Sequence, residues 1–180
     1  MFKEININEL SMNPFTKIGS EWVLLAAGSE SGFNMMTASW AGFGMFWNKN
    51  VVTVYIRESR FTRKFFDESS LFTVSFYDEA YRDALNKCGY LHGNKCDKAK
   101  EAGLTPYFIG GTTAFMEANL IFLCRKLLHA DIAKETADAP EVFSAVYPSG
   151  DLHRLYIGEI LSVLKKNHNH PSNGWFAQGL

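Results

Sequence analysis

The sequence has few of the features that would link it to a membrane, an oxidising compartment or a nucleic acid. No stretch approaches eighteen uncharged apolar residues, and the first residues lack the charged and then apolar run of a signal peptide. The three cysteines are odd in number and lack CxxC spacing, so we expect free thiols in a reducing compartment. A net charge of −1 provides no basic face for nucleic acid. We therefore expect a cytoplasmic protein without membrane or nucleic-acid partners.

The usual nucleotide-binding and catalytic motifs are also missing. Gly42-Phe43-Gly44 lacks the third glycine of the dinucleotide fingerprint, and the chain has no Walker loop. No arrangement of residues suggests a nucleophile triad. His168 and His170 form an HxH pair in a polar tail, but no third ligand accompanies them, so we expect no metal site.

Apolar and aromatic residues are abundant by contrast. Of the 180 residues, 47% are hydrophobic and 14% aromatic, including fifteen Phe. A chain of this length can bury roughly 70% of its unfolded surface, which is enough for a full core. With neither repeats nor low-complexity linkers, residues 1–180 are expected to form one domain, with a core over about 20–164 and a polar tail over 165–180. The surplus of rings suits a ligand pocket or a subunit interface.

Short alternating segments predict a mainly β protein with a few short helices. The clearest is Val51–Arg57, where Val52, Val54 and Ile56 share the face expected in the core. A long helix does not follow each strand, so a closed antiparallel barrel is favoured over a doubly wound sheet. Strands are predicted at 22–27, 36–46, 51–57, 71–76, 107–109, 120–128 and 152–164, helices at 59–68, 79–87 and 97–102, and irregular chain before residue 22 and over 131–148.

Residues 34–66 carry the most distinctive chemistry. Asn34–Trp40 combines amide and hydroxyl side chains with a Trp, which suits the edge and face of a flat aromatic ring. Arg57–Thr62 places arginines and hydroxyls at the expected start of a helix, which suits a phosphate. A core-forming strand would hold the two halves apart.

Several blocks, in order, resemble the flavin reductase-like, FMN-binding split-barrel family, which includes flavoredoxin. The resemblance spans roughly residues 20–164 and implies an antiparallel, Greek-key-like split β-barrel that forms a homodimer and binds FMN near the subunit interface. The matching blocks are Asn34–Trp40, Trp47–Lys49, Val54–Thr62, Cys88–Gly89, Asp97–Lys98, Gly103–Pro106, Cys124–Lys126 and His153–Ile160.

Site residues can be assigned on this basis. Lys98 is a candidate cation beside the reduced ring, and His153 is expected near the ring or the substrate, so both are candidate catalytic residues. Several candidate site residues also have an ordinary structural interpretation. Ser59 could be a helix cap, Arg57 and Lys98 solvated charges, Trp40 a core residue and His153 a hydrogen-bonded strand residue. The cofactor-binding candidates are Asn34, Met36, Thr37, Ala38, Ser39 and Trp40 for the ring, Arg57, Ser59, Arg60, Phe61 and Thr62 for the phosphate, and Lys98.

The resemblance implies an FMN-binding oxidoreductase that transfers hydride or electrons between NAD(P)H and flavin, or another small acceptor. The alternative is an FMN-binding electron carrier with a protein redox partner, and a purely structural barrel is a third possibility.

Two departures from the family pattern affect the site. Glu58 stands where relatives often have proline, and Cys96 lies in a run, His92–Lys98, that replaces an arginine-containing loop.

Overall fold

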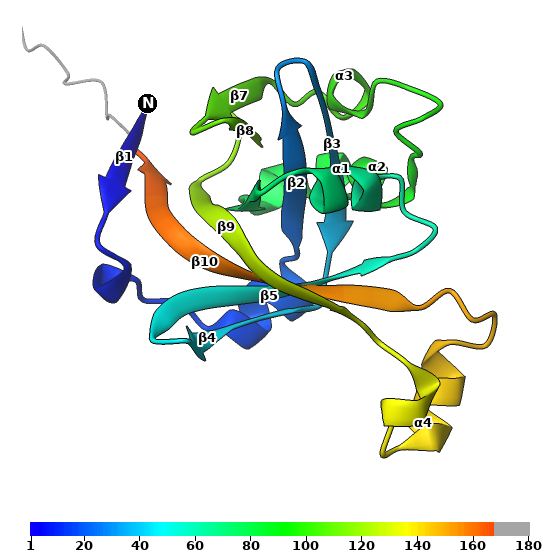
Figure 1. Ribbon diagram of the computed structural model, residues 1–180. Coiled ribbons are helices and arrows are strands. Elements are labelled where there is room, and N and C mark those ends of the chain that lie inside the picture. The colour runs from blue at the N-terminus through cyan, green and yellow to red at the C-terminus, as the bar shows by residue number, and fades with distance from the viewer. Residues whose placement is uncertain (168–180) are drawn as a thin grey trace, which may run out of the picture.

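Residues 1–167 are described by the computed structural model, and strands dominate them. Four helices and several single turns connect the strands (Figure 1). The strands are β1 Phe2–Ile5, β2 Val23–Ser29, β3 Gly32–Ala38, β4 Ala41–Phe46, β5 Lys49–Arg57, β6 Leu71–Phe76, β7 Pro106–Ile109, β8 Thr112–Phe115, β9 Leu120–Asp131 and β10 His153–Lys166. The helices are α1 Thr62–Glu68, α2 Arg82–Tyr90, α3 Lys98–Ala102 and α4 Pro140–Val146, and the short turns are η1 Ile7–Glu9, η2 Thr16–Ser20, η3 Glu79–Tyr81 and η4 Lys134–Thr136.

Eight strands form one antiparallel sheet in the order β3-β2-β6-β9-β10-β5-β4, with β1 also paired to β10. β7 and β8 form a separate hairpin. The long strands β9 and β10 cross the molecule, while α1, α2 and α3 lie together beside β2 and β3 (Figure 1). The prediction of a mainly antiparallel β fold with short helices is confirmed.

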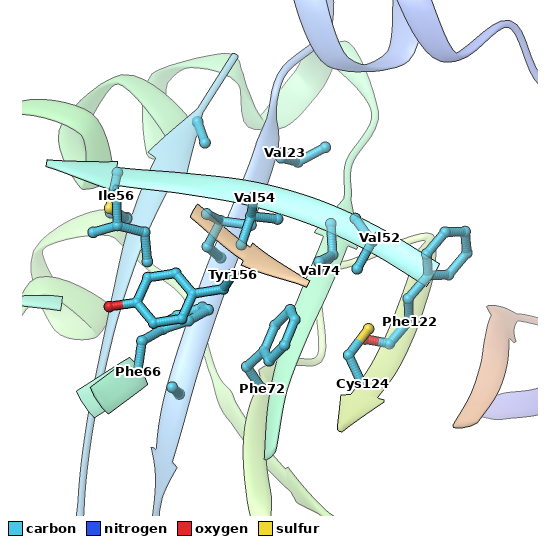
Figure 2. Close-up of a cluster of buried hydrophobic side chains, with 14 of the residues drawn as sticks. Val23, Val52, Val54, Ile56, Phe66, Phe72, Val74, Phe122, Cys124 and Tyr156 are labelled. Carbon is cyan, nitrogen blue, oxygen red and sulfur yellow. The ribbon is translucent and has the colours of Figure 1, made fainter. Parts of the chain in front are cut away.

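The main core lies inside this curved sheet. Val52, Val54 and Ile56 are fully buried, as the alternation of β5 predicts. Figure 2 shows these side chains facing Tyr156 of β10 and Phe72 of β6. Burial of each large apolar side chain contributes about 1.5–3 kcal/mol, so this cluster is the main stabilising element under the site.

Two predicted segments differ from the structure. The single bent strand expected over 36–46 is wrong, because the chain breaks at Ser39 and Trp40 and its two halves pair with different neighbours, β2 and β5. The irregular loop expected over 131–148 is also wrong, because it contains η4 and α4. Pro140 occupies the first turn of α4, where its missing N–H costs nothing.

The structure corrects three further expectations. β1 stands where irregular chain was expected, paired with the end of β10. Residues 165 and 166 belong to β10 and not to a loose tail. Ser59 does not cap α1, which starts at Thr62 and has no side-chain cap bond. The His168–His170 pair and the end of the expected tail lie outside the described residues. Within the described part, no cluster of three or more metal-ligating acids, histidines and cysteines occurs.

Candidate functional site

A cavity of about 290 Å³ opens between β3, β5 and the start of β10. The turn that joins β3 to β4 and the segment just before α1 complete its wall. The side chains come from these five parts of the chain, and most were predicted to be site residues. The cavity is lined by Met36, Thr37, Ala38, Ser39, Trp40, Tyr55, Arg57, Arg60 and His153.

The ladder between β5 and β10 explains why distant residues meet here. His153 pairs directly with Arg57, and Leu155 pairs with Tyr55. Residues directly opposite one another in an antiparallel ladder point to the same face, so His153 stands beside Arg57 at the cavity. Tyr55 lies two residues before Arg57 and shares its face. One register therefore sets the positions of three lining side chains.

The half of the cavity predicted for an aromatic ring is formed by the end of β3 and the following turn. Trp40 is 45% exposed, and its ring centroid lies 4.9 Å from that of His153. Ser39 is exposed beside it, whereas Ala38 and Met36 are buried and present only an edge. The hydroxyl of Thr37 donates to the carbonyl of Leu85 in α2, so toward a ligand it can act only as an acceptor.

His153 is enclosed and held in the neutral form. Its Nδ1 atom lies 2.9 Å from the hydroxyl of Tyr147, and its side chain is largely buried. Burial, assisted by the positive charge of Arg57 and opposed by Asp151, lowers the pKa of His153 to about 4. The imidazole is therefore uncharged at neutral pH and offers one donor and one acceptor nitrogen.

The half predicted for a phosphate contains two arginines, of which only one is tied to an acid. Arg57 donates from Nη1 to the backbone carbonyl of Asp151 at 3.1 Å, and the same nitrogen lies 3.9 Å from the Asp151 carboxylate. Arg60 donates to the carbonyl of Gly89, and burial lowers its pKa. Ser59 donates to the Asp151 carboxylate from both its backbone N–H and its hydroxyl.

A second, more open cavity of about 600 Å³ adjoins the first at Arg60. Ser59 and Phe61 line this second cavity and not the first, so the predicted phosphate residues are divided between the two. Glu58, the departure noted in the sequence, is exposed on the same wall, and its backbone N–H donates to Leu152. The acid therefore lies at the rim and not among the donors.

Three predicted site residues are not brought to the cavity. Asn34 donates from Nδ2 to the hydroxyl of Thr62 at 3.0 Å, and that hydroxyl donates to the carbonyl of Met35. Nζ of Lys98 donates to the same carbonyl at 2.5 Å, and burial lowers the pKa of this amine to about 8. Asn34, Thr62 and Lys98 thus form a buried polar network behind β3, where they support its position.

Sequence reasoning missed three residues of the site. Tyr55 shares a face with Arg57, so alternation along the strand was sufficient to find it. Tyr147 bonds to His153, and Arg57 lies over its ring at 5.6 Å from the centroid. Asp151 bonds to Ser59. Tyr147 belongs to the segment predicted to be irregular, 131–148, and Asp151 lies between that segment and the strand predicted from residue 152. Nothing local in the sequence marks the long-range partners of these two residues.

The mainly antiparallel sheet with few helices defines a class, the split barrels. A family model for the flavin reductase like domain matches residues 15–179. The chain therefore belongs to the flavin reductase-like family. The comparison with curated proteins found no match.

Solved structures with the same fold have low sequence identity to this chain. Flavoredoxin from Methanosarcina acetivorans is 19% identical with a TM-score of 0.66, over 82% of this chain and 69% of that one. The FMN-binding domain of a flavin reductases-like enzyme from Shewanella baltica OS155 is 17% identical with a TM-score of 0.65, over 94% and 82%. Nitrilotriacetate monooxygenase component B from Bacillus cereus is 20% identical with a TM-score of 0.64, over 93% and 83%. Such identities establish the fold alone.

Proposed function

We propose that the protein binds FMN in the cavity between β3, β5 and β10 and acts as an oxidoreductase of the flavin reductase type. In this proposal NAD(P)H is the hydride donor, and flavin or another small molecule is the acceptor. The observation that carries the proposal is the meeting of Trp40, His153, Arg57 and Arg60 around one cavity. Aromatic and polar groups lie at one end and guanidinium groups at the other, which fits a ring joined to a phosphate.

The ring end of the cavity is assigned to β3 and the turn that follows it. Ser39 supplies an exposed hydroxyl, Trp40 supplies an aromatic face, and Met36 and Ala38 supply apolar edges. Thr37 helps to fix β3 against α2 through its bond to Leu85. When bound, the flavin would supply the hydride chemistry, while the protein binds and orients it and excludes water.

The phosphate end is assigned to Arg57, Ser59 and Arg60, with Phe61 at the neighbouring wall. Guanidinium groups form strong charge-assisted hydrogen bonds to phosphate. Replacement of Arg57 and Arg60 together by Ala is expected to weaken binding of FMN more than binding of riboflavin, which has no phosphate. Equal losses for the two ligands in equilibrium titrations would remove these arginines from the phosphate.

His153 is assigned a proton-holding role at the ring end. In this proposal the Tyr147 hydroxyl donates to Nδ1, so the Nε2 atom carries the proton and donates toward the cavity. A neutral imidazole suits this role because its low pKa keeps it uncharged throughout the neutral range. Lys98 is assigned to positioning, because its amine holds the Met35 carbonyl next to Met36 of the cavity wall.

Steady-state oxidation of NADH and NADPH in the presence of FMN tests the enzymatic proposal. We expect turnover with at least one of the two nucleotides, and a lower kcat in His153→Ala. The second candidate is an electron carrier that receives electrons from a protein partner, which the likeness to a flavoredoxin supports. Bound FMN without nicotinamide turnover would exclude the reductase and favour the carrier.

A homodimer is also part of the proposal. β4 lies at one end of the sheet order, and the adjoining apolar side chains of Phe15 and Met45 are 85% and 67% exposed. An apolar hollow beside Phe15 includes Ser39, which also lines the site cavity. Large exposed apolar patches mark interaction surfaces. A second copy covering this face would lie at the edge of the site.

Sedimentation analysis tests the dimer. We expect the natural chain to sediment as a dimer at micromolar concentration and the double variant Phe15→Lys, Met45→Lys to sediment as a monomer. The control variant Leu161→Lys changes an exposed apolar residue elsewhere and should remain a dimer. A monomeric natural chain would contradict this part of the proposal.

Within residues 1–167, no helix is long and apolar enough to span a membrane. A cytoplasmic location stays a prediction.

A further inference from the structure

The carboxylate of Asp151 occupies the donors that a phosphate would use. Its Oδ1 atom accepts from the backbone N–H of Ser59 at 3.0 Å, and its Oδ2 atom accepts from the Ser59 hydroxyl at 2.7 Å. Arg57 lies 3.9 Å from Oδ2 and also bonds to the backbone carbonyl of Asp151 at 3.1 Å. Ser59 and Arg57, two of the three residues assigned to the phosphate, are therefore already engaged by an anion of the same chain, whereas Arg60 bonds to the carbonyl of Gly89.

The charges around Asp151 make it an effective substitute for a ligand anion. Although its partial burial favours the neutral acid, the hydrogen bonds from Ser59 and the charge of Arg57 hold the pKa of Asp151 below its usual value. Its negative charge also acts on Arg60 and His153. With Asp151 in place, the two arginines and the aspartate sum to a single positive charge, whereas a phosphate monoester brings about −1.5 to −2.

Asp151 belongs to a segment that is only lightly attached to the barrel. Residues 132–152 connect β9 to β10 and include α4, which has no buried residue. α4 stands apart from the other three helices (Figure 1). At the site the segment is held by contacts from Asp151 to Ser59 and Arg57 and from Tyr147 to His153 and Arg57. One backbone bond, from the N–H of Glu58 to the carbonyl of Leu152, also holds it there. Because few apolar contacts are buried here, a local rearrangement of this segment costs little free energy.

We propose that Asp151 is an intramolecular competitor for the flavin phosphate, which leaves Ser59 when FMN binds and so sets the preference between phosphorylated and unphosphorylated flavins. This inference rests on the proposed function. A phosphate needs the Ser59 donors and Arg57, and it cannot share them with a carboxylate without repulsion between like charges. Riboflavin ends in a neutral hydroxyl and leaves the Asp151 contacts intact. Asp151 therefore penalises FMN and not riboflavin.

Equilibrium titrations of FMN and riboflavin into three proteins test this inference. They are the natural chain, Asp151→Asn, and the control Asp138→Asn, which removes an exposed acid from the same segment. Two charges 4 Å apart interact by about 1–4 kcal/mol between bulk water and a protein surface, and 1.4 kcal/mol corresponds to tenfold. We therefore expect Asp151→Asn to tighten FMN at least about fivefold relative to riboflavin. Asp138→Asn should leave this ratio unchanged.

The outcomes separate the inference from the proposed function. If both flavins bind and Asp151→Asn leaves the ratio of their affinities unchanged or shifts it toward riboflavin, the inference is overturned while the FMN site stands. If neither flavin binds to any of the three proteins, the proposed function fails and the inference fails with it.

A second measurement uses the unmodified protein. Trypsin can cleave after the exposed Lys134 of the 132–152 segment. Release of Asp151 by a phosphate loosens this segment, so saturating FMN should speed cleavage at Lys134 and saturating riboflavin should not. Equal protection of Lys134 by the two flavins would also overturn the inference.

Discussion

His153 lies between two aromatic rings, Trp40 and Tyr147, and opposite Arg57 in the β-ladder. Burial and the neighbouring guanidinium lower its pKa to about 4 from an ordinary value of 6.5. Between these two pH values the unfolded chain binds a proton at this position that the folded chain does not bind. The free energy of unfolding therefore rises with pH across this window.

Replacement of His153 by Gln removes the titrating group, so we expect the increase in the free energy of unfolding between pH 4 and pH 6.5 to become smaller. Urea unfolding of both proteins at several pH values in this window gives the two slopes. Equal slopes would show that His153 is not held neutral in the folded state.

Thr62, predicted to bind the cofactor, lies instead in the buried polar network behind β3. Its hydroxyl accepts from Asn34 and donates to the Met35 carbonyl in a fully buried position. Thr62→Val removes the acceptor of Asn34 Nδ2, whereas the Met35 carbonyl still accepts from Lys98, and a buried unsatisfied group costs about 1–3 kcal/mol. Thr62→Ser keeps the hydroxyl and should lose less. Chemical denaturation measures both variants, and equal losses would mean that the hydroxyl contributes nothing beyond packing.

At the scale of the elements, periodic segments were predictable and connections were not. The alternation of Val52, Val54 and Ile56 identified β5 and its buried face, and Gly103 marked the end of α3 through its positive φ. α4 was missed because Pro140 was interpreted as a loop residue, although it occupies a favourable first-turn position. The break between β3 and β4 arises because the two halves of segment 36–46 pair with different strands, β2 and β5. The local sequence pattern does not encode this choice of partner.

A close contact inside the barrel gives a prediction at the same scale. A Cβ atom on Gly158 of β10 would come within 2.3 Å of the Phe72 ring and 3.2 Å of Cys124. Phe72 is enclosed in the core and cannot move aside freely (Figure 2). Overpacking of this kind costs typically about 1–3 kcal/mol, so we expect Gly158→Ala to destabilise the protein by that amount.

Gly44 of β4 provides the matched control for this substitution. A Cβ on Gly44 meets no atom within 4 Å, so Gly44→Ala should unfold at nearly the denaturant concentration of the natural chain. Urea denaturation of the two variants side by side makes the comparison. A Gly158→Ala protein as stable as Gly44→Ala would show that the core at Phe72 is looser than the structure indicates.

At the scale of the whole molecule, the site is a product of strand register. The residue types near Trp40 and Arg57 were readable from the sequence because they lie in one stretch. Their meeting with His153 depends on the pairing of β5 with β10 across most of the chain. The placement of Asp151 and Tyr147 depends on the same pairing, because they lie two and six residues before the start of β10 and contact Ser59 and His153. Long-range pairing of this kind is not visible in local periodicity. The sequence therefore predicted most of the residues that line the cavity but not Asp151 and Tyr147, which contact them.

Binding of FMN by this barrel can be measured by the visible absorption spectrum of the purified protein, after it has been mixed with FMN and freed of unbound ligand. We expect a yellow protein that retains one FMN per chain. A colourless protein that is folded by circular dichroism, and that takes up no FMN even from an excess, would contradict this expectation.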